Sequence, residues 1–451
     1  MPVAPSDSTS GLGDLGLGPP PRAAATLGAL WLLVFTAASQ TIIITPVLPV
    51  IGEALGVGVD VLGSLVSAYS WALAGAALVM GPISDRIGRR RVLLIGSGAL
   101  AGALVLHGLA NTFEMLLAAR ILAGICGGML SGAAVSYVGD AVPYRRRGWA
   151  TGIVMSGIPV GLVLGVPVGR ILAAGIDFRV PFVAFAALMG IAFLLVLAVV
   201  PQPDVKLDES RLDAKEFVLG YLRLLGDAGN RAAALTYFLM YLSLGLFIAF
   251  LPQWITDTQP LDVILFGKPV TLGGLPVDFI AMLFSVGGLA SIVIGPWAGG
   301  LSDRAGRKPI ILASCIGLLL VTVSVTYLVG PDSRWALYPI YVAVMALFAL
   351  RASPLQALLT ALVPGRQRGT LMSLVIAVGQ IGTGAGAVLA GMVYAGAGFR
   401  TVTFISAATI LVMALVVWWA LPEPTADATL APAPQDDTAE PLNAEASVAA
   451  S

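Results

Sequence analysis

The chain carries the segment SDRIGRR at residues 84–90 and repeats it as SDRAGRK at residues 302–308. A second pair follows in the same order, with VPYRRRG at residues 142–148 and VPGRQRG at residues 363–369. The first pair is separated by 218 residues and the second by 221. A third, shorter match at the 221-residue separation joins Phe178-Arg179 to Phe399-Arg400. Ordered matches at a nearly constant separation indicate that the chain contains two copies of one unit.

The composition is that of an integral membrane protein. Of the 451 residues, 58% are hydrophobic and 11% are charged, and the mean hydropathy is +0.93. A soluble domain has about 45–50% apolar and about 25% charged residues, so a water-soluble enzyme is excluded. The 25 basic and 25 acidic residues balance, which leaves no basic footprint for nucleic acid. Two cysteines in apolar runs and one histidine predict no disulfide framework, metal site or bound cofactor.

Twelve stretches are long enough to cross a membrane, which takes about 20 mainly apolar residues. They lack the period-two alternation of barrel strands. The sequence therefore predicts an all-α membrane protein with twelve transmembrane helices in two pseudo-symmetric six-helix bundles. The stretches are Ala23–Gly52, Val61–Ser84, Val92–Phe113, Met115–Gly139 (containing Arg120), Gly148–Gly169, Val180–Pro203, Ala232–Thr256, Phe279–Ser302, Pro309–Pro331, Trp335–Gly365 (containing Arg351), Gly369–Phe399 and Thr401–Pro422.

Basic residues are divided unevenly between the two ends of these helices. With the N-terminus inside, 18 Lys and Arg lie on the cytoplasmic side and four on the outer side, as the positive-inside rule requires. We expect a multi-pass protein of the inner (plasma) membrane with both termini in the cytoplasm. The predicted parts are a disordered tail (1–22), two six-helix bundles (23–203 and 232–422), a cytoplasmic linker between them (204–231), a long outer loop (257–281) and a disordered acidic tail (423–451).

The motifs resemble those of the major facilitator superfamily. The segment GPISDRIGRRR at residues 81–91 looks like the family's signature loop, and its degenerate copy follows the eighth predicted helix. The fourth predicted helix resembles the family's second motif, with Arg120 followed by three glycines. The segment GIPVGLVLGVPVG at residues 157–169 is similar to the helix-5 motif of the twelve-helix drug:proton antiporter and sugar-efflux permease branch. Over residues 25–422, the resemblance implies a secondary transporter, not an enzyme, that works as a monomer.

The resemblance also implies a cytoplasmic gate built from the two repeated loops, which joins the halves when the transporter faces outward. The loop acid can additionally interact with the positive N-terminal end of a neighbouring helix. The alternative is that the basic loop residues are only positive-inside anchors. The candidate gate residues are Gly81, Asp85, Arg86, Gly88, Arg89, Asp303, Arg304, Gly306 and Arg307.

Glycine recurs at every fourth position of the fifth predicted helix and forms one groove. Small residues let another backbone approach closely where lipid removes the hydrophobic driving force, and prolines can kink the helix. We expect this groove either to slide against the other half or to pack statically against a neighbour. The interface residues are Gly157, Gly161, Gly165, Pro167 and Gly169.

By the resemblance, predicted helices 1, 4, 7 and 10 line a central cavity. Arg351 is too deep to reach either surface, so we expect it in this cavity; a structural arginine bonded to backbone carbonyls is the alternative. Arg170 lies near the outer surface and is expected to extend its side chain towards water. The two tyrosines could equally be core residues. The candidate lining residues are Gln40, Arg120, Tyr237, Tyr241, Arg351 and Gln356.

The expected function is export of a small amphipathic drug or metabolite by alternating access, with H+ as the coupling ion. The expected partners are this small-molecule substrate and the lipid bilayer. No carboxylate lies deep in a predicted span, and Glu114 or Asp140 could carry the proton. One alternative is uptake of a small organic anion. The other, from a different class, is a membrane sensor or scaffold that does not transport.

Overall fold

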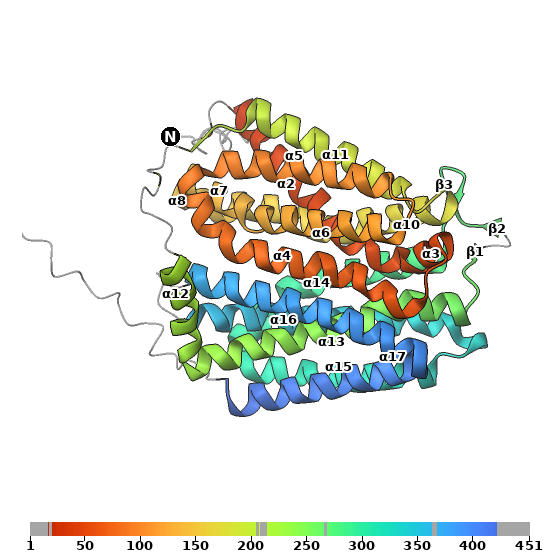
Figure 1. Cartoon of the computed structure of the whole chain (residues 1–451). Helices are drawn as coiled ribbons and strands as arrows, with labels where there is room; N and C mark the ends of the chain where they lie inside the picture. Colours follow the sequence, from red (N-terminus) through yellow and green to blue (C-terminus); the bar gives the residue numbers. More distant parts are fainter. Residues whose placement is uncertain are drawn as a thin grey trace, which may run out of the picture.

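The chain forms a bundle of long helices that run side by side (Figure 1). This computed structural model describes residues 20–203, 214–265, 268–362 and 368–421, together with Leu17 and Leu207. The predicted tails therefore lie outside the described residues, apart from Leu17 and the start of the first helix. The same holds for most of the first ten residues of the predicted linker.

The first half contains six spans, three of which are interrupted. A glycine with a φ of 77° separates the two helices of span 4 at Gly132. In span 5 the π-helical segment precedes Pro167, which has no N–H to donate. The spans are α2 (Pro20–Ile42) with α3 (Ile44–Leu55), α4 (Val59–Ile87), α5 (Arg89–Gly108), α6 (Phe113–Leu130) with α7 (Ala133–Ala141), α8 (Tyr144–Met155) with α9 (Gly157–Val160), η1 (Gly161–Gly165) and α10 (Val166–Gly175), and α11 (Val180–Val199).

The second half follows a short helix in the predicted linker, α12 (Ala214–Gly226). Its spans are α13 (Ala228–Thr258), α14 (Phe279–Ala305), α15 (Arg307–Leu328), α16 (Leu337–Leu362) after the 3-10 turn η2 (Pro331–Ala336), and α17 (Arg368–Trp419). Gly398, at a φ of 73°, interrupts α17. At 1.5 Å per residue, a helix of this length is roughly twice as long as a membrane is thick.

The described residues contain eleven helices long and apolar enough to cross a membrane. Because α17 supplies two crossings, one on each side of Gly398, the predicted all-α fold with twelve spans in two bundles is confirmed. The helices of the first half, red to yellow in Figure 1, lie above those of the second half, green to blue. Large apolar side chains such as Leu194, Ile316 and Leu320 are exposed, as expected where lipid is the solvent.

The two ends of the bundle differ, and we name them by their loops. The signature face carries the repeated loops at Gly88 and Gly306, and the hairpin face lies opposite. The predicted long outer loop forms two small antiparallel hairpins on the hairpin face, which the sequence did not predict. Their strands are β1 (Ile264–Leu265) with β2 (Lys268–Pro269), and β3 (Thr271–Leu272) with β4 (Leu275–Pro276).

Candidate functional site

A cavity of about 790 Å³ lies between the two halves. Its wall comes from α2, α3, α4, α6, α7 and the span-5 helices of the first half, and from α13, α14, α16 and α17 of the second. Most lining residues are aliphatic or aromatic. Among the described lining residues, Arg120 carries the one charged side chain, and none is Asp, Glu, Lys or His. The size and the apolar wall with a few polar groups are typical of a small-molecule site.

The polar groups of the first half gather around Arg120. The Tyr69 hydroxyl lies 2.6 Å from Thr41 Oγ1 and accepts a hydrogen bond from Gln40 Nε2 at 3.0 Å. The Arg120 guanidinium lies over the Tyr69 ring, 4.7 Å from its centroid. Its Nε and Nη1 donate long hydrogen bonds of 3.4 and 3.5 Å to the Leu65 and Gln40 carbonyls. Its Nη2 and Gln40 Oε1 are buried without a partner among the described residues, and such groups call for a ligand or water.

Glycines on α6 hold this cluster together. A Cβ at Gly127 would lie 2.5 Å from the Tyr69 hydroxyl, and one at Gly128 would lie 2.6 Å from the Leu73 carbonyl oxygen. The absence of side chains therefore lets α6 and α4 approach closely, which brings Arg120 against Tyr69. The sequence motif pointed to Arg120 and these glycines. It gave no signal for Tyr69, because a tyrosine in an apolar span does not differ in sequence from a packing residue.

The six residues predicted for the cavity separate into two groups. Arg120, Tyr241 and Gln356 line it. Gln40 is fully buried behind the lining and orients Tyr69. Tyr237 is also buried, with its ring tilted against that of Tyr241 at 5.4 Å between centroids.

The prediction that Arg351 faces the cavity is wrong. Its neighbours Ala352 and Ser353 line the cavity, whereas Arg351 is fully buried on another side of α16. There its guanidinium lies 5.3 Å from the Phe348 ring centroid, and Nη1 lies 3.9 Å from the Met413 sulfur. The alternative of bonds to freed carbonyls does not hold for the described residues either, because Nε and Nη2 have no hydrogen-bond partner. The depth of Arg351 in the membrane made a lipid-facing side chain unfavourable. It did not show whether the side chain points into the cavity or is packed between helices.

The first signature loop is held within its own half. Gly88 joins α4 to α5 with a φ of 94°, where a side chain would be strained. Arg89 pairs with Asp85, donates to Asp140 Oδ2 at 2.8 Å, and donates to Ser84 at 2.9 Å. Among the described residues, no hydrogen bond or ion pair joins Asp85 to the other half. The gate between the halves therefore remains a prediction for another conformation.

The remaining gate residues lie beside these two loops. Gly306 repeats the backbone of Gly88 with a φ of 87°, which is structural evidence for the duplication. Arg307 donates to the Ala357 carbonyl of α16 at 3.2 Å. The Asp303 side chain lies outside the described residues. Gly81 and Arg304 are exposed, and Arg86 donates to the Pro82 carbonyl at 3.2 Å.

The glycine groove of span 5 packs against α2 of the same half. A Cβ at Gly157 would lie 2.8 Å from Phe35 N, and one at Gly161 would lie 2.7 Å from Ser39 Oγ. Gly165 faces the same serine, and Gly169 faces Ile43. The groove therefore faces a helix of its own half and not the other half, as a surface sliding between the halves would require; static packing stays a prediction. Pro167 is buried at the start of α10, after the π-helical turn.

Two sets of contacts join the halves on the hairpin-face side of the cavity. Ser67 of α4 donates to the Gly384 carbonyl of α17 at 2.6 Å. Arg170 of α10 donates from Nε to Asp278 Oδ2 at 2.7 Å, where Asp278 caps α14. Arg170 is buried, so the prediction that its side chain extends to water is wrong. The carboxylate that pairs with Arg170 belongs to the other half, 108 residues away in the chain, so the sequence did not indicate this partner.

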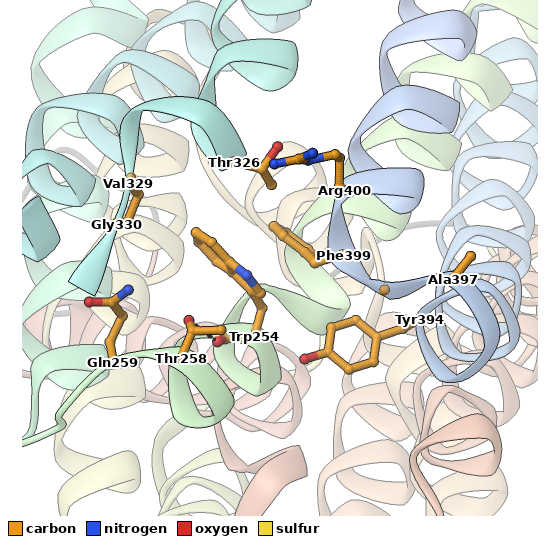
Figure 2. A pocket seen from close by; sticks show the side chains of 11 residues that line it. Trp254, Thr258, Gln259, Thr326, Val329, Gly330, Tyr394, Ala397, Phe399 and Arg400 are labelled. Atoms are coloured by element: carbon orange, nitrogen blue, oxygen red, sulfur yellow. Dashed lines mark hydrogen bonds between the residues drawn. The ribbon is translucent and has the colours of Figure 1, made fainter.

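A second cavity of about 610 Å³ lies inside the second half, where α13, α15 and the break in α17 meet (Figure 2). Trp254 and Phe399 stack at 5.0 Å between ring centroids in its middle. Arg400 and Thr326 lie on one side of this pair, and Gln259 lies on the other. It shares no lining residue with the cavity between the halves.

Comparison with known proteins agrees with this architecture. The sequence model of the Major Facilitator Superfamily matches residues 30–346 and 233–448. The multidrug resistance protein MdtG of Klebsiella pneumoniae is 26% identical over 412 residues, which cover 89% of this chain and 95% of MdtG. MdtG of Enterobacter lignolyticus is 26% identical over 387 residues, covering 84% and 88% of the two chains.

Solved structures show the same fold at low sequence identity. A bacterial homologue of the human lysosomal transporter Spinster, in an inward-facing and unoccupied conformation, has a TM-score of 0.70 at 16% identity and covers 90% of this chain and 98% of its own. A mutant of the nucleoside transporter NupG has a TM-score of 0.71 at 15% identity, covering 88% and 100%. With twelve spans in two repeated halves around a central cavity, and with the family model matching most of its length, the chain belongs to the Major Facilitator Superfamily of membrane transporters.

Proposed function

We propose that this transporter exports neutral or anionic amphipathic molecules of drug size in exchange for protons. The observation that carries the proposal is the wall of the cavity between the halves. It encloses about 790 Å³, is mainly apolar, and has one guanidinium and no carboxylate among its described residues. Apolar walls accept varied amphipathic molecules, and Arg120 without a nearby acid disfavours a lipophilic cation. Multidrug resistance, named for the MdtG relatives, supports export of more than one compound.

The proposed direction depends on orientation in the bacterial inner membrane. The division of 18 basic residues against four supports a cytoplasmic location of the signature face. The cavity wall extends to Val135 and Gln356, each six residues before the signature-face end of its span. The contacts between Ser67 and Gly384 and between Arg170 and Asp278 lie nearer the hairpin face. This arrangement supports loading of substrate from the cytoplasm.

Two acids of span 4 are candidates for the coupling proton. Asp140 accepts from Arg89 at the signature face, and 28% of its side chain is exposed. Glu114 is exposed in the first turn of α6, near the hairpin face. Because both have access to water and lie on span 4, which also carries Arg120, we propose that one of them exchanges the proton. Neutralising each acid singly, as Asp140→Asn and Glu114→Gln, separates the two.

The test is accumulation of a compound panel in cells that lack their main efflux pumps. The panel contains anionic, zwitterionic, neutral and cationic drugs, measured with and without a protonophore. We expect lower accumulation of neutral and anionic compounds, with the difference abolished by the protonophore. Gly165→Leu, which places a side chain against Ser39, serves as the inactive control at matched membrane levels. Export of cations alone, or no change for any compound, would contradict the proposal.

Uptake of a small organic anion is the second candidate, favoured by the unpaired Nη2 of Arg120 in the cavity wall. The same panel distinguishes it, because uptake raises the accumulation of radiolabelled anions instead of lowering it. A protein that alters no compound in either direction would instead fit a sensor or scaffold.

A further inference from the structure

We propose that Arg170 and Asp278 form a latch that holds the hairpin face closed and must break each time that face opens. We call these two side chains the hairpin-face latch. The inference builds on the proposed transport cycle, but the latch itself is defined by contacts between the two halves.

The contacts of the latch connect three helices across the two halves. Arg170 of α10 donates from Nε to Asp278 Oδ2 at 2.7 Å and from Nη1 to the Pro46 carbonyl of α3 at 2.7 Å. Asp278 Oδ1 accepts the Ala281 N–H at 2.8 Å, which caps α14. Each charged side chain is therefore fixed within its own half, and the bond between them crosses the boundary.

Burial separates this pair from the other ion pairs near the hairpin face. The Arg170 and Asp278 side chains are 2% and 10% exposed. Asp278 is the one buried Asp or Glu in the part of the chain that the structure describes. The pair between Arg179 and Asp177 lies within the first half at 3.1 Å, with 26% and 42% exposure. Exposed pairs contribute little, whereas removing one member of a buried pair leaves an uncompensated charge.

The latch is connected to the cavity through the helices that it joins. Thr45, one residue before Pro46, lines the cavity from α3. Phe284 lines it from α14, less than two turns after Asp278. Opening the cavity to the hairpin face requires the two halves to separate there, and α10 of the first half packs against α14 of the second. That movement separates Arg170 from Asp278. The latch therefore favours the state that is closed at the hairpin face.

The test uses the substitution Thr45→Cys in a chain that also carries Cys126→Ala and Cys315→Ala. A membrane-impermeant maleimide is applied to right-side-out or inverted vesicles, so that each face is probed separately. Asp278→Asn removes the charge, and asparagine caps a helix as well as aspartate does. Arg170→Gln removes the other charge. Arg179→Gln is the matched control, because its ion pair stays within one half.

We expect Asp278→Asn and Arg170→Gln each to raise the labelling rate from the hairpin face by about tenfold or more, since each leaves a buried charge unpaired in the closed state. The double variant leaves no buried charge unpaired, so its labelling rate should lie between the parent rate and that of the single variants. Arg179→Gln should leave the rate unchanged.

The inference is overturned if both single variants label at the parent rate, or if Arg179→Gln accelerates labelling equally. It is also overturned if labelling rises equally from both faces, which would indicate general loosening. Because the labelling needs no substrate, a failure of the latch leaves the export test unaffected. Likewise, failure of export in the compound panel leaves the labelling result valid.

Discussion

Replacing Arg120 with methionine tests which of the two deep arginines contacts the substrate. The guanidinium lies in the cavity wall, with its Nη2 unpaired and its other nitrogens in hydrogen bonds of 3.4 and 3.5 Å. A hydrogen bond from a charged donor contributes about 1.5–3 kcal/mol. With about 1.4 kcal/mol for each factor of ten, Arg120→Met should raise the half-saturating concentration of an anionic substrate roughly 10- to 150-fold. A neutral substrate of similar size should change little.

Arg351→Met is the matched control. Arg351 is as fully buried as Arg120 and lies in the opposite half, but it does not line the cavity. Methionine is similar in length and apolar in both positions, so the two variants remove the same chemistry from different places. The half-saturating concentration of either substrate should stay within about twofold of the parent value in Arg351→Met.

The assay is the initial rate of transport into inverted vesicles at several substrate concentrations. An anionic and a neutral compound from the export panel are compared at equal levels of protein. Equal losses for both compounds in Arg120→Met would show that the arginine supports the structure and does not recognise charge. A loss in Arg351→Met as large as that in Arg120→Met would refute the placement of the site.

Three further tests concern the packing and the gate. Arg351→Met should raise the unfolding temperature of the detergent-solubilised protein, because two buried donors without partners are removed; a lower temperature would show that the guanidinium is needed. Gly165→Leu should destabilise the protein by about 1–3 kcal/mol, because the new side chain overpacks against Ser39. Leu164→Ile, at an exposed neighbouring position, should leave the stability unchanged. Equal stabilities of the two variants in chemical denaturation would contradict this expectation. Asp85→Asn should increase maleimide labelling of a cavity cysteine from the signature face, and unchanged labelling together with unchanged transport would exclude the gate role.

The predicted organisation of the chain followed from local sequence. Twelve apolar stretches and two repeated loops gave the number of spans and the duplication, and the structure has left-handed glycines at both Gly88 and Gly306. These features depend on segment length and on backbone conformation, which neighbouring residues largely control. The hairpins β1–β4 were missed because each strand has only two residues, too few for a periodic pattern.

The direction in which each side chain points within a span could not be read from the sequence. In a soluble helix the apolar face marks the core, but lipid and protein interior are both apolar, so a transmembrane helix carries no such contrast. The sequence therefore placed Arg351 deep in the membrane without showing that it points away from the cavity. It identified the glycine groove of span 5 without showing that its neighbour is α2.

The sequence by itself determined that this protein crosses the membrane twelve times in two related halves, because hydropathy and repetition are properties of the chain. Only the tertiary structure decided which polar groups meet. Arg170 and Asp278 are 108 residues apart in the chain and 2.7 Å apart in space. Tyr69 joins Thr41 and Arg120 from three different helices. Such pairs form because helix packing brings buried charges and hydroxyls to the few partners available in a medium without water.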